Sequence, residues 1–350
     1  MPRVLLLSGR DADLQTVRAT DALSTRLGDD FSTERAAIGD RDVRNGLAAV
    51  RWVRRHAPTV DLVHAFGADA LTAAAVGFSG PILYSPIEFP SRREIGWLRA
   101  VSAYRNVQVV ASTTTQHKII VTSAGAAADR CHLIRPGVDF SNVRRRRDDA
   151  LRARLGFGPD DFVILACGES TKNSAHEGAA WAAGILHFLD PRVRLLLWGH
   201  GKRAARIGRY ASHIVSPTFA GVGRKLGDDF SYEALLPATD LVVVSAKGPV
   251  ATLPVAIAMA AALPIVSTVS YTVSELLEDR HTALMSRNAT PGELARRIQD
   301  VRNDSTLQWS IADTARAEAY EHFSLTRFLN DYRTLYRQVA AGQAVELGAS

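Results

Sequence analysis

Short runs of apolar residues alternate along the chain with longer segments in which apolar residues recur every three or four positions. A run that is apolar throughout is typical of a strand buried on both faces of a parallel sheet. The longer segments, such as VRNGLAAVRWVRRHA and HEGAAWAAGILHFL, have the periodicity of helices. The apolar runs are VLLLS (4–8), DLVHAF (61–66), PILYS (81–85), VQVVAS (107–112), CHLIRPG (131–137), FVILACG (162–168), RLLLWGHG (194–201), DLVVVS (240–245) and LPIVST (263–268). This alternation predicts an α/β chain with two doubly wound, Rossmann-like domains.

A polar segment, SNVRRRRDDALRARLGFGPDD, marks the boundary between the two halves. We predict a first domain over residues 1–143, a second domain over 150–318, and a C-terminal helix over 319–345 that packs back on the first domain. The four arginines of 144–147 are a candidate phosphate or lipid contact, but a solvated linker that leads into a helix is the favoured interpretation. A ligand is expected between the two domains, outside the carboxyl ends of the strands.

Composition and length exclude several classes of protein. With 350 residues, 47% of them hydrophobic, the chain is long enough for two cores and too apolar for a disordered protein. No apolar run reaches the roughly 20 residues that span a bilayer. The N-terminus MPRVLLLSGRDAD has too short an apolar segment for a signal peptide and no small-residue cleavage site. We therefore expect a first strand there and a cytoplasmic protein.

The net charge of +6 favours phosphate-bearing ligands or an anionic membrane surface, so a peripheral membrane contact stays open as a hypothesis. The basic residues are not interleaved with aromatic ones, and a nucleic acid is not a predicted partner. Cys131 and Cys167 lie far apart and lack the spacing of a zinc site. They predict free buried thiols, and we expect no bound metal.

The stretch DLVVVSAKGPVATLPVAIAMAAALPIVST (240–268) predicts a buried strand, a turn rich in Gly and Pro, a helix of small residues and a second strand. With its flanks it resembles the pattern aDvfvlPS..EgfGlp.lEAmA.GlPvvat..gg..Ei of the GT-B glycosyltransferases of family 4, also called group 1. Three further segments resemble that family in the same order: CHLIRPGVDFSNV, LRARLGFGPDDFVILACGES and YEHFSLTRFLNDYRTLYRQV. The resemblance covers nearly the whole chain. It implies two facing Rossmann-like domains, with the acceptor domain first and the nucleotide-sugar donor domain second.

The resemblance breaks at the residues that hold the donor. In the family, two glutamates eight residues apart contact the hydroxyls of the sugar and the ribose. The corresponding residues here are Pro249 and Ile257, whose side chains accept no hydrogen bond. The glycine that usually follows the intervening helix is Ala262. Each lost charge-assisted hydrogen bond is worth about 1.5–3 kcal/mol, so the resemblance implies a degenerate donor-site motif.

The positions that grip the donor diphosphate differ as well. Family members have an arginine after the glycine of the second domain's first strand and a lysine several residues later. Here Glu169 follows Gly168, and the lysine position holds Ser174 or Ala175. A carboxylate at the first of these positions repels a phosphate.

Other residues of the second domain are candidates for holding the donor. Lys172 lies in a loop before a helix and could reach a phosphate, with an exposed loop lysine as an equal alternative. The turn Gly199-His200-Gly201-Lys202 follows a strand and could cradle an anion, although a simple strand-to-helix turn is favoured.

Lys247 and Gly248 precede the helix of small residues, whose amide groups and dipole favour a phosphate without any side chain. A structural turn is an equal alternative there. Glu275 matches a glutamate of the family pattern, and an exposed helix residue is the favoured interpretation. The predicted donor-binding candidates are thus Lys172, His200, Lys202, Lys247, Gly248 and Glu275.

In these transferases a histidine of the first domain often follows a central strand near the donor. His64 matches it in DLVHAF, which implies a catalytic role in which the ring binds a sugar hydroxyl or stabilises the leaving phosphate. A histidine that only satisfies groups at the strand end is the alternative. Arg10, in the loop SGRDADLQ, and Glu88, in PIEFPSRREIGW, are acceptor-side candidates, although a solvated loop carboxylate is favoured for Glu88.

The resemblance implies a retaining, metal-independent glycosyltransferase that moves a sugar from a nucleotide-sugar donor to an unknown acceptor without a cofactor. Such transfer needs mainly positioning and stabilisation of the leaving nucleoside diphosphate. The degenerate motif leaves a second hypothesis open, a catalytically inactive pseudo-glycosyltransferase that acts as a partner or scaffold for another protein. A nucleotide-sugar epimerase lacks support because the sequence has no catalytic carboxylate cluster.

Overall fold

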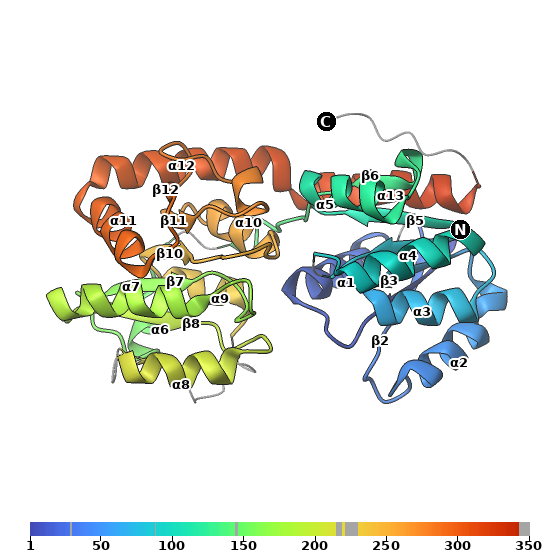
Figure 1. The fold of residues 1–350 in the computed structure, drawn as a ribbon, viewed down its shortest axis with the longest axis horizontal. Helices are drawn as coiled ribbons and strands as arrows, with labels where there is room; N and C mark the ends of the chain where they lie inside the picture. Colours follow the sequence, from blue (N-terminus) through green and yellow to red (C-terminus); the bar gives the residue numbers. More distant parts are fainter. Residues whose placement is uncertain (29, 88, 144–145, 215–218, 221–229, 343–350) are drawn as a thin grey trace. The chain divides into compact units, whose positions relative to one another are not determined.

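The computed structural model describes residues 1–28, 30–87, 89–143, 146–214, 219–220 and 230–342 (Figure 1). The chain divides into two compact units. The first unit consists of Met1–Gly137 together with the C-terminal segment from Leu325, and the second consists of Val138–Ser324.

The first unit is built on a parallel sheet of six strands in the order β2-β1-β3-β4-β5-β6. The strands are β1 (Arg3–Ser8), β2 (Ser32–Ala37), β3 (Leu62–Phe66), β4 (Ile82–Ser85), β5 (Val107–Ala111) and β6 (Cys131–Leu133). The helices are α1 (Leu14–Arg26), α2 (Gly46–His56), α3 (Ala68–Gly77), α4 (Arg92–Tyr104), α5 (Thr114–Ile119) and α13 (Leu325–Ala340), with short turns at Ala57–Thr59, Ile120–Ala124 and Ala128–Arg130. The strand order reverses between β1 and β3, which is where open α/β sheets bind ligands.

Short polar side chains set where the helices of the first unit begin. Asp13, Asn45, Ser91 and Thr113 are N-cap residues, and each side chain accepts a hydrogen bond from the backbone amide three residues further on. Each contact satisfies an amide that the helix leaves unpaired and contributes about 1 kcal/mol. The caps therefore explain why α1, α2, α4 and α5 start at the residues that follow them.

Alternate residues of β1 point into two different cores. Leu5 and Leu7 belong to the core that contains residues of α2, α3 and α4. Val4 and Leu6 belong to the core that contains residues of α1 and α13. Both faces of the sheet are therefore covered, as the continuous apolar runs predict. The aromatic residues that α13 contributes to its core are Phe328, Tyr332 and Tyr336.

The last helix, α13, packs on the first unit, and this prediction for the end of the chain is confirmed. Arg333 Nε lies 2.6 Å from Asp30 Oδ2, and Arg337 also pairs with Asp30, at 2.5 Å. The helix that returns begins at Leu325, and the long helix before it belongs to the second unit.

The second unit contains a second parallel sheet of six strands, in the order β12-β11-β10-β7-β8-β9. The strands are β7 (Phe162–Ala166), β8 (Val193–Leu197), β9 (Phe219–Ala220), β10 (Leu241–Val244), β11 (Ile265–Thr268) and β12 (Leu284–Ser286). The helices are α6 (Asp149–Arg154), α7 (His176–Leu189), α8 (Ala204–Ile214), α9 (Tyr232–Leu235), α10 (Leu253–Ala260), α11 (Pro291–Asn303) and α12 (Ser305–Phe323), with short turns at Leu236–Ala238 and Val273–Glu275. The predicted pair of parallel α/β sheets is thus confirmed.

Helix α10 is buried along its whole length and lies against α12. Its small residues allow this close packing. Ile257, at one of the two expected glutamate positions, is only 2% exposed and is part of this interior. A side chain at this position therefore faces protein and not solvent.

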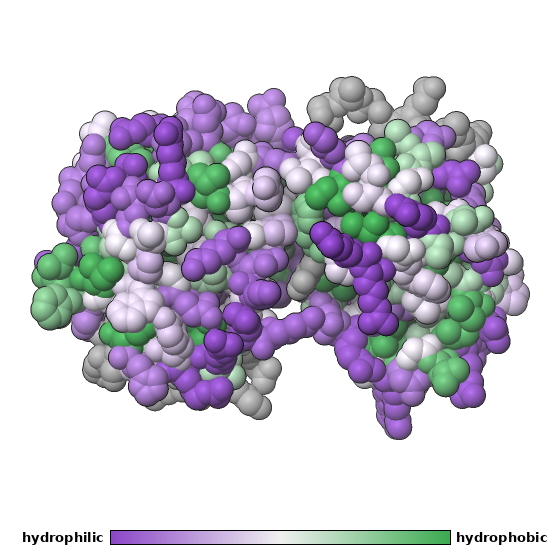
Figure 2. Space-filling view, in the orientation of Figure 1, coloured by the Kyte–Doolittle hydropathy of each residue, from purple (hydrophilic) through white to green (hydrophobic). Residues whose placement is uncertain are grey.

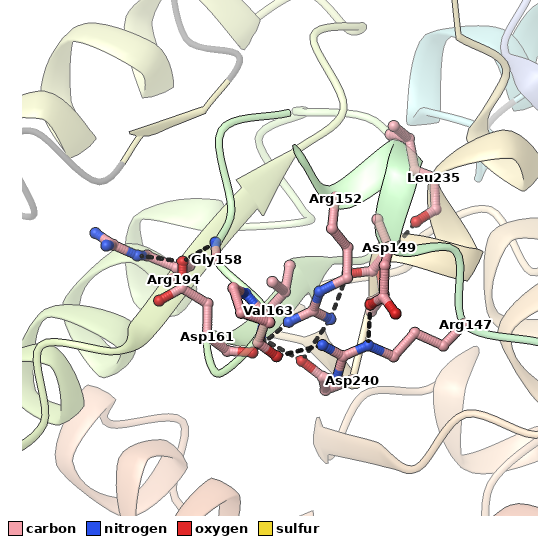
Figure 3. Close-up of polar contacts among 12 residues, drawn as sticks. Arg147, Asp149, Arg152, Gly158, Asp161, Val163, Arg194, Leu235 and Asp240 are labelled. Atoms are coloured by element: carbon pink, nitrogen blue, oxygen red, sulfur yellow. Dashed lines mark hydrogen bonds and ion pairs between the residues drawn. The ribbon is translucent and has the colours of Figure 1, made fainter. Parts of the chain in front are cut away.

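A polar cluster fixes the beginning of the second unit (Figure 3). Arg152, which is 1% exposed, donates to Ala238 O at 3.1 Å and to Asp240 Oδ2 at 3.0 Å, and it also binds Asp161 O. Arg147 pairs with Asp149 at 2.7 Å and with Asp240 at 3.8 Å. This arginine of the 144–147 run is thus held by carboxylates of its own unit, which agrees with a linker and helix start. Residues 144–145 lie outside the described part of the chain.

None of the helices in the described part is both long and apolar enough to cross a bilayer. Cys131 and Cys167 are buried free thiols, as predicted, and burial raises the pKa of each to about 12. Within the same described ranges, no group of three His, Cys, Asp or Glu side chains could hold a metal ion.

Candidate functional site

Four loops of the second unit follow the carboxyl ends of neighbouring parallel strands. They are residues 167–175 after β7, 198–203 after β8, 245–252 after β10 and 269–272 after β11. Because the strands are parallel, these loops share one edge of the sheet, the usual position of ligand sites in such sheets. All six predicted donor-binding candidates lie on these loops or on the turn that follows the last one.

The loops after β7 and β10 are bound to each other through their backbones. Lys247 N donates to Asn173 O at 2.9 Å, and Asn173 Nδ2 donates to Pro249 O at 2.9 Å. A Cβ atom at Gly248 would lie 2.9 Å from Asn173 Oδ1, so a larger residue there would have to displace the Asn173 side chain. Pro249, at the other expected glutamate position, thus takes part through its backbone carbonyl.

The loop after β8 packs on the loop after β7 in the same way. Ser170 N donates to His200 O at 2.8 Å, and Arg203 N donates to Ser170 O at 2.9 Å. Gly201 has φ +104°, and a Cβ atom there would lie 2.6 Å from Ser170 O. The ring of His200 lies against Trp198, with centroids 4.2 Å apart. The three loops therefore form one continuous backbone surface.

His176, which the sequence analysis missed, holds the loop after β7 in place. It is 1% exposed, its Nε2 lies 3.1 Å from Cys167 O, and its Nδ1 lies 3.0 Å from Ser170 Oγ. The carbonyl can only accept, so Nε2 carries the proton and Nδ1 accepts from the serine hydroxyl. Burial lowers the pKa of His176 to about 4. The ring is therefore neutral near pH 7. In the sequence, only its position at the start of the predicted helix HEGAAWAAGILHFL points to a structural role.

The start of α10 lies next to the glycine that ends β7. Gly168 has φ +69°, and a Cβ atom there would lie 2.9 Å from Pro254 Cγ. Val250 N donates to Thr272 Oγ1 at 3.0 Å, which ties the loop after β11 to the same place. Ser270, in that loop, is 9% exposed and its hydroxyl has no hydrogen-bond partner among the described residues. These contacts bring loops after three strands to the beginning of one helix.

The side chains of the donor candidates differ in exposure. Lys172, Lys202 and Lys247 are exposed, whereas His200 and Glu275 are half-buried. The sequence contains lysine only at 118, 172, 202, 225 and 247, so the loops at this edge carry most of the lysines of an arginine-rich chain. This edge thus combines glycine-containing loops with exposed lysines.

His64 lies in the interior of the first unit and not at its surface. It is 0% exposed, its Nδ1 lies 2.7 Å from Tyr336 Oη, and its Nε2 lies 2.9 Å from Ser85 Oγ. Burial lowers its pKa well below 6.5. Since both ring nitrogens have protein partners, the geometry fits the alternative interpretation, a histidine that satisfies polar groups between β3, β4 and α13.

On the acceptor side, the loop after β1 is bound to the start of α3. Arg10 N donates to Asp69 Oδ2 at 3.0 Å, and Gly9 N donates to Phe66 O at 2.7 Å. A Cβ atom at Gly9 would lie 2.2 Å from Asp69 Oδ1. Arg10 is exposed, and Glu88 lies outside the described residues. Asp69, which the sequence analysis did not consider, is therefore the residue that organises this loop.

A cavity of about 560 Å³ opens beside Asp69, between the first turns of α3 and α4. Glu94, in its wall, accepts a hydrogen bond from Tyr84 Oη, and burial followed by the Glu94 charge raises the pKa of Tyr84 well above 10. Trp97 is 40% exposed and is one of the residues that line the cavity. The lining residues are Ala68, Asp69, Thr72, Ser91, Arg93, Glu94, Gly96 and Trp97. Both helices begin at the carboxyl edge of the sheet, so the cavity lies at the ligand-binding edge.

Residues 161–304 match the family model described as glycosyl transferases group 1. The chain is 26% identical over 300 residues to a D-inositol 3-phosphate glycosyltransferase of Rhodococcus jostii (strain RHA1), a match that covers 77% of this chain and 63% of the relative. It is 31% identical over 152 residues to the D-inositol 3-phosphate glycosyltransferase of Rhodococcus opacus (strain B4), covering 43% of this chain and 32% of the relative. The chain thus spans less than two thirds of the length of these relatives.

Two solved structures have the same fold over almost the whole chain. Anabaena HepE in complex with UDP and glucose gives a TM-score of 0.80 at 17% identity, with 97% of this chain and 100% of that chain covered. Sucrose-phosphate synthase from Thermosynechococcus elongatus gives a TM-score of 0.81 at 15% identity, with 98% and 100% covered. The predicted GT-B fold is therefore confirmed.

Proposed function

We propose that this chain transfers a sugar from a nucleotide-sugar donor to an acceptor hydroxyl, because residues 161–304 match the family model of group 1 glycosyl transferases and the chain has the GT-B fold. In this reaction the bond between the anomeric carbon and the diphosphate breaks. A glycosidic bond to the acceptor oxygen forms, the hydroxyl proton is released, and the nucleoside diphosphate leaves. Retention at the anomeric carbon and independence of a metal ion, as the family resemblance implies, belong to this proposal.

The observation that carries the proposal is the edge of the second sheet. The loops after β7, β8, β10 and β11 meet at the start of α10, and Gly168, Gly201 and Gly248 lie at their contacts, where no side chain of their own intervenes. Backbone amides beside a helix start favour phosphate oxygens. The exposed ammonium groups of Lys172 and Lys247 add charge-assisted contacts, worth about 1.5–3 kcal/mol each. We assign the donor diphosphate to this edge, where it would be stabilised as it leaves.

The acceptor is assigned to the cavity of the first unit. The indole of Trp97 offers an apolar face to a sugar or polyol ring, and the carboxylates of Asp69 and Glu94 accept hydrogen bonds from hydroxyl groups. Arg93 adds a cation for an acidic substituent. The relatives named as D-inositol 3-phosphate glycosyltransferases make an inositol phosphate the first acceptor to test.

The second hypothesis, an inactive scaffold protein, keeps a specific observation in its favour. Because positions 249 and 257 hold a proline and an isoleucine, neither offers a carboxylate to the ribose or the sugar. Ile257 is also buried in α10, and the carbonyl of Pro249 is bound to Asn173. An active protein would have to hold these groups with the backbone surface alone.

A thermal-shift panel of nucleoside diphosphates and their sugars separates the two hypotheses, with UDP and UDP-glucose tested first because HepE was crystallised with UDP and glucose. We expect stabilisation by one nucleotide and roughly tenfold weaker binding in Lys247→Ala, as loss of one charge-assisted contact implies. Lys118→Ala, an exposed lysine of α5, is the matched control. Binding followed by release of free nucleoside diphosphate with acceptor supports the transferase. No stabilisation by any nucleotide supports the scaffold.

A further inference from the structure

Helix α7 has a row of large apolar side chains on its exposed side. Trp181, Ile185, Phe188 and Leu189 are 45%, 39%, 89% and 72% exposed, and their spacing places them on one face of the helix. We call these four residues the α7 ridge. The opposite face of α7 is part of the core of the second unit. In Figure 2 a hydrophobic group lies at the left edge, where α7 ends in Figure 1.

Apolar side chains on both faces make α7 unusual for a surface helix. A helix at the surface of a globular unit normally buries one apolar face and presents a polar one. Exposed apolar side chains are common singly, but a contiguous group of aromatic and aliphatic ones marks a surface that binds something. Phe188 and Leu189 end the helix and are the most exposed members, so the ridge is most prominent there.

The negative charges of α7 and of the residue that follows it are paired with arginines. Glu177 of α7 pairs with Arg203 at 3.5 Å. Asp190, just after α7, pairs with Arg192 at 3.1 Å and with Arg302 at 2.6 Å, and these hydrogen bonds hold its pKa well below its usual range. The acidic residue within α7 and the one that directly follows it are therefore already neutralised.

The neighbouring helix α8 supplies the uncompensated charge. It contacts α7, and Trp181 Nε1 donates to Tyr210 Oη. Its sequence, AARIGRYASHI, contains no acidic residue, and Arg206 and Arg209 are exposed. Neither arginine pairs with an acidic residue in the described part of the chain. An apolar ridge thus lies beside two guanidinium groups available to an anionic partner.

We propose that the α7 ridge docks on an anionic lipid surface. The apolar side chains would enter the boundary between headgroups and acyl chains, and Arg206 and Arg209 would bind lipid phosphates. Trp181 and Tyr210, joined by a hydrogen bond between the indole N–H and the phenol oxygen, are the aromatic residue types that concentrate at membrane interfaces. A protein partner would need acidic groups to match the arginines. A bilayer of anionic lipid supplies both the phosphates for the arginines and the apolar layer for the ridge.

Flotation with lipid vesicles tests the proposal on the full chain. We expect binding to vesicles of phosphatidylcholine with phosphatidylglycerol, weaker binding at high salt, and little binding to phosphatidylcholine alone. The double variant F188S/L189S should bind about tenfold more weakly or worse, because it removes the most exposed apolar groups. The matched control is W309S, since Trp309 is 71% exposed on a different helix, α12. Equal binding by F188S/L189S and wild type, or no binding by wild type, overturns the proposal.

A second measurement reports directly on which surface meets the lipid. An environment-sensitive fluorophore is attached at F188C or at W309C, and the native Cys131 and Cys167 are buried and slow to react. The emission of the label at position 188 should shift to the blue with anionic vesicles, and that of the label at 309 should not. Sedimentation velocity tests whether the ridge binds a second copy of the chain. A dimer that F188S/L189S abolishes would overturn the lipid proposal.

Discussion

The two units both have parallel sheets of six strands, but the loops and helix starts at the carboxyl edges of these sheets differ in character. In the second unit the edge consists of backbone, with glycines at the points of closest approach and lysines around them. In the first unit the edge consists of side chains, with Asp69, Glu94 and Trp97 around one cavity. A backbone edge suits a diphosphate, whose oxygens are read by amides, and a side-chain edge suits a ring with several hydroxyl groups. One fold can thus divide the recognition of two substrates between two kinds of surface.

The largest expected effect comes from breaking the backbone edge at Gly201. Gly201→Ala places a Cβ atom 2.6 Å from Ser170 O at a φ of +104°, so strain and overpacking together should cost about 3 kcal/mol of unfolding free energy. Nucleotide binding should be lost with it. Gly199→Ala in the same loop is the control, because a Cβ atom there has no neighbour within 4 Å. Urea unfolding of both variants checks this, and similar stabilities would argue against a packed edge.

The next prediction concerns the pH dependence of stability, which depends on a buried histidine in each unit. Burial lowers the pKa of His176 in the second unit and of His132 in the first from 6.5 to about 4. Between these values the unfolded chain binds a proton that the folded chain does not, so stability should fall as the pH falls below about 6.5, by up to about 3 kcal/mol for each histidine. Unfolding midpoints from pH 7 to pH 4 measure the slope. His176→Gln should flatten it for the second unit, and His213→Gln, an exposed position on α8, should not.

A smaller effect is expected at the side-chain edge. Trp97→Ala removes the apolar wall of the cavity and should weaken the binding of a polyol such as myo-inositol about tenfold, while nucleotide binding stays unchanged. Tyr104→Ala serves as the control, since Tyr104 is an exposed aromatic residue of the same helix outside the cavity. Ligand-observed NMR gives both affinities. Loss of nucleotide binding in Trp97→Ala would contradict the division between the two edges.

The smallest effect concerns the turn after α10. Ala262 has φ +53°, a left-handed conformation in which glycine carries no penalty. Ala262→Gly should therefore stabilise the protein by about 0.5–1 kcal/mol in chemical unfolding. The neighbouring Ala261 has φ −73°, and Ala261→Gly should instead destabilise it by about 1 kcal/mol. Effects of the same sign in both variants would exclude this explanation.

The sequence predicts the sheets because their central strands are apolar throughout. Strand β2 is not predicted because STERAA lies at the edge of its sheet, has no buried residue and contains no apolar run. His64 was predicted as a ligand contact, whereas its partner Tyr336 lies 272 residues away in the sequence and only the fold brings them together. The cavity beside Asp69 escaped for a similar reason, since two helices from different parts of the chain form it. The loops of the second unit were identified because each follows its strand directly.

The return of α13 has a consequence for the order in which the protein matures. Phe328, Tyr332 and Tyr336 complete the core beneath Val4 and Leu6, yet they are synthesised after the whole of the second unit. The second unit, which is continuous from Val138 to Ser324, can fold as soon as it emerges. The sheet of the first unit keeps one apolar face uncovered until α13 is made, so a chain that stops before α13 should be degraded by proteases or held by chaperones although its second unit is folded.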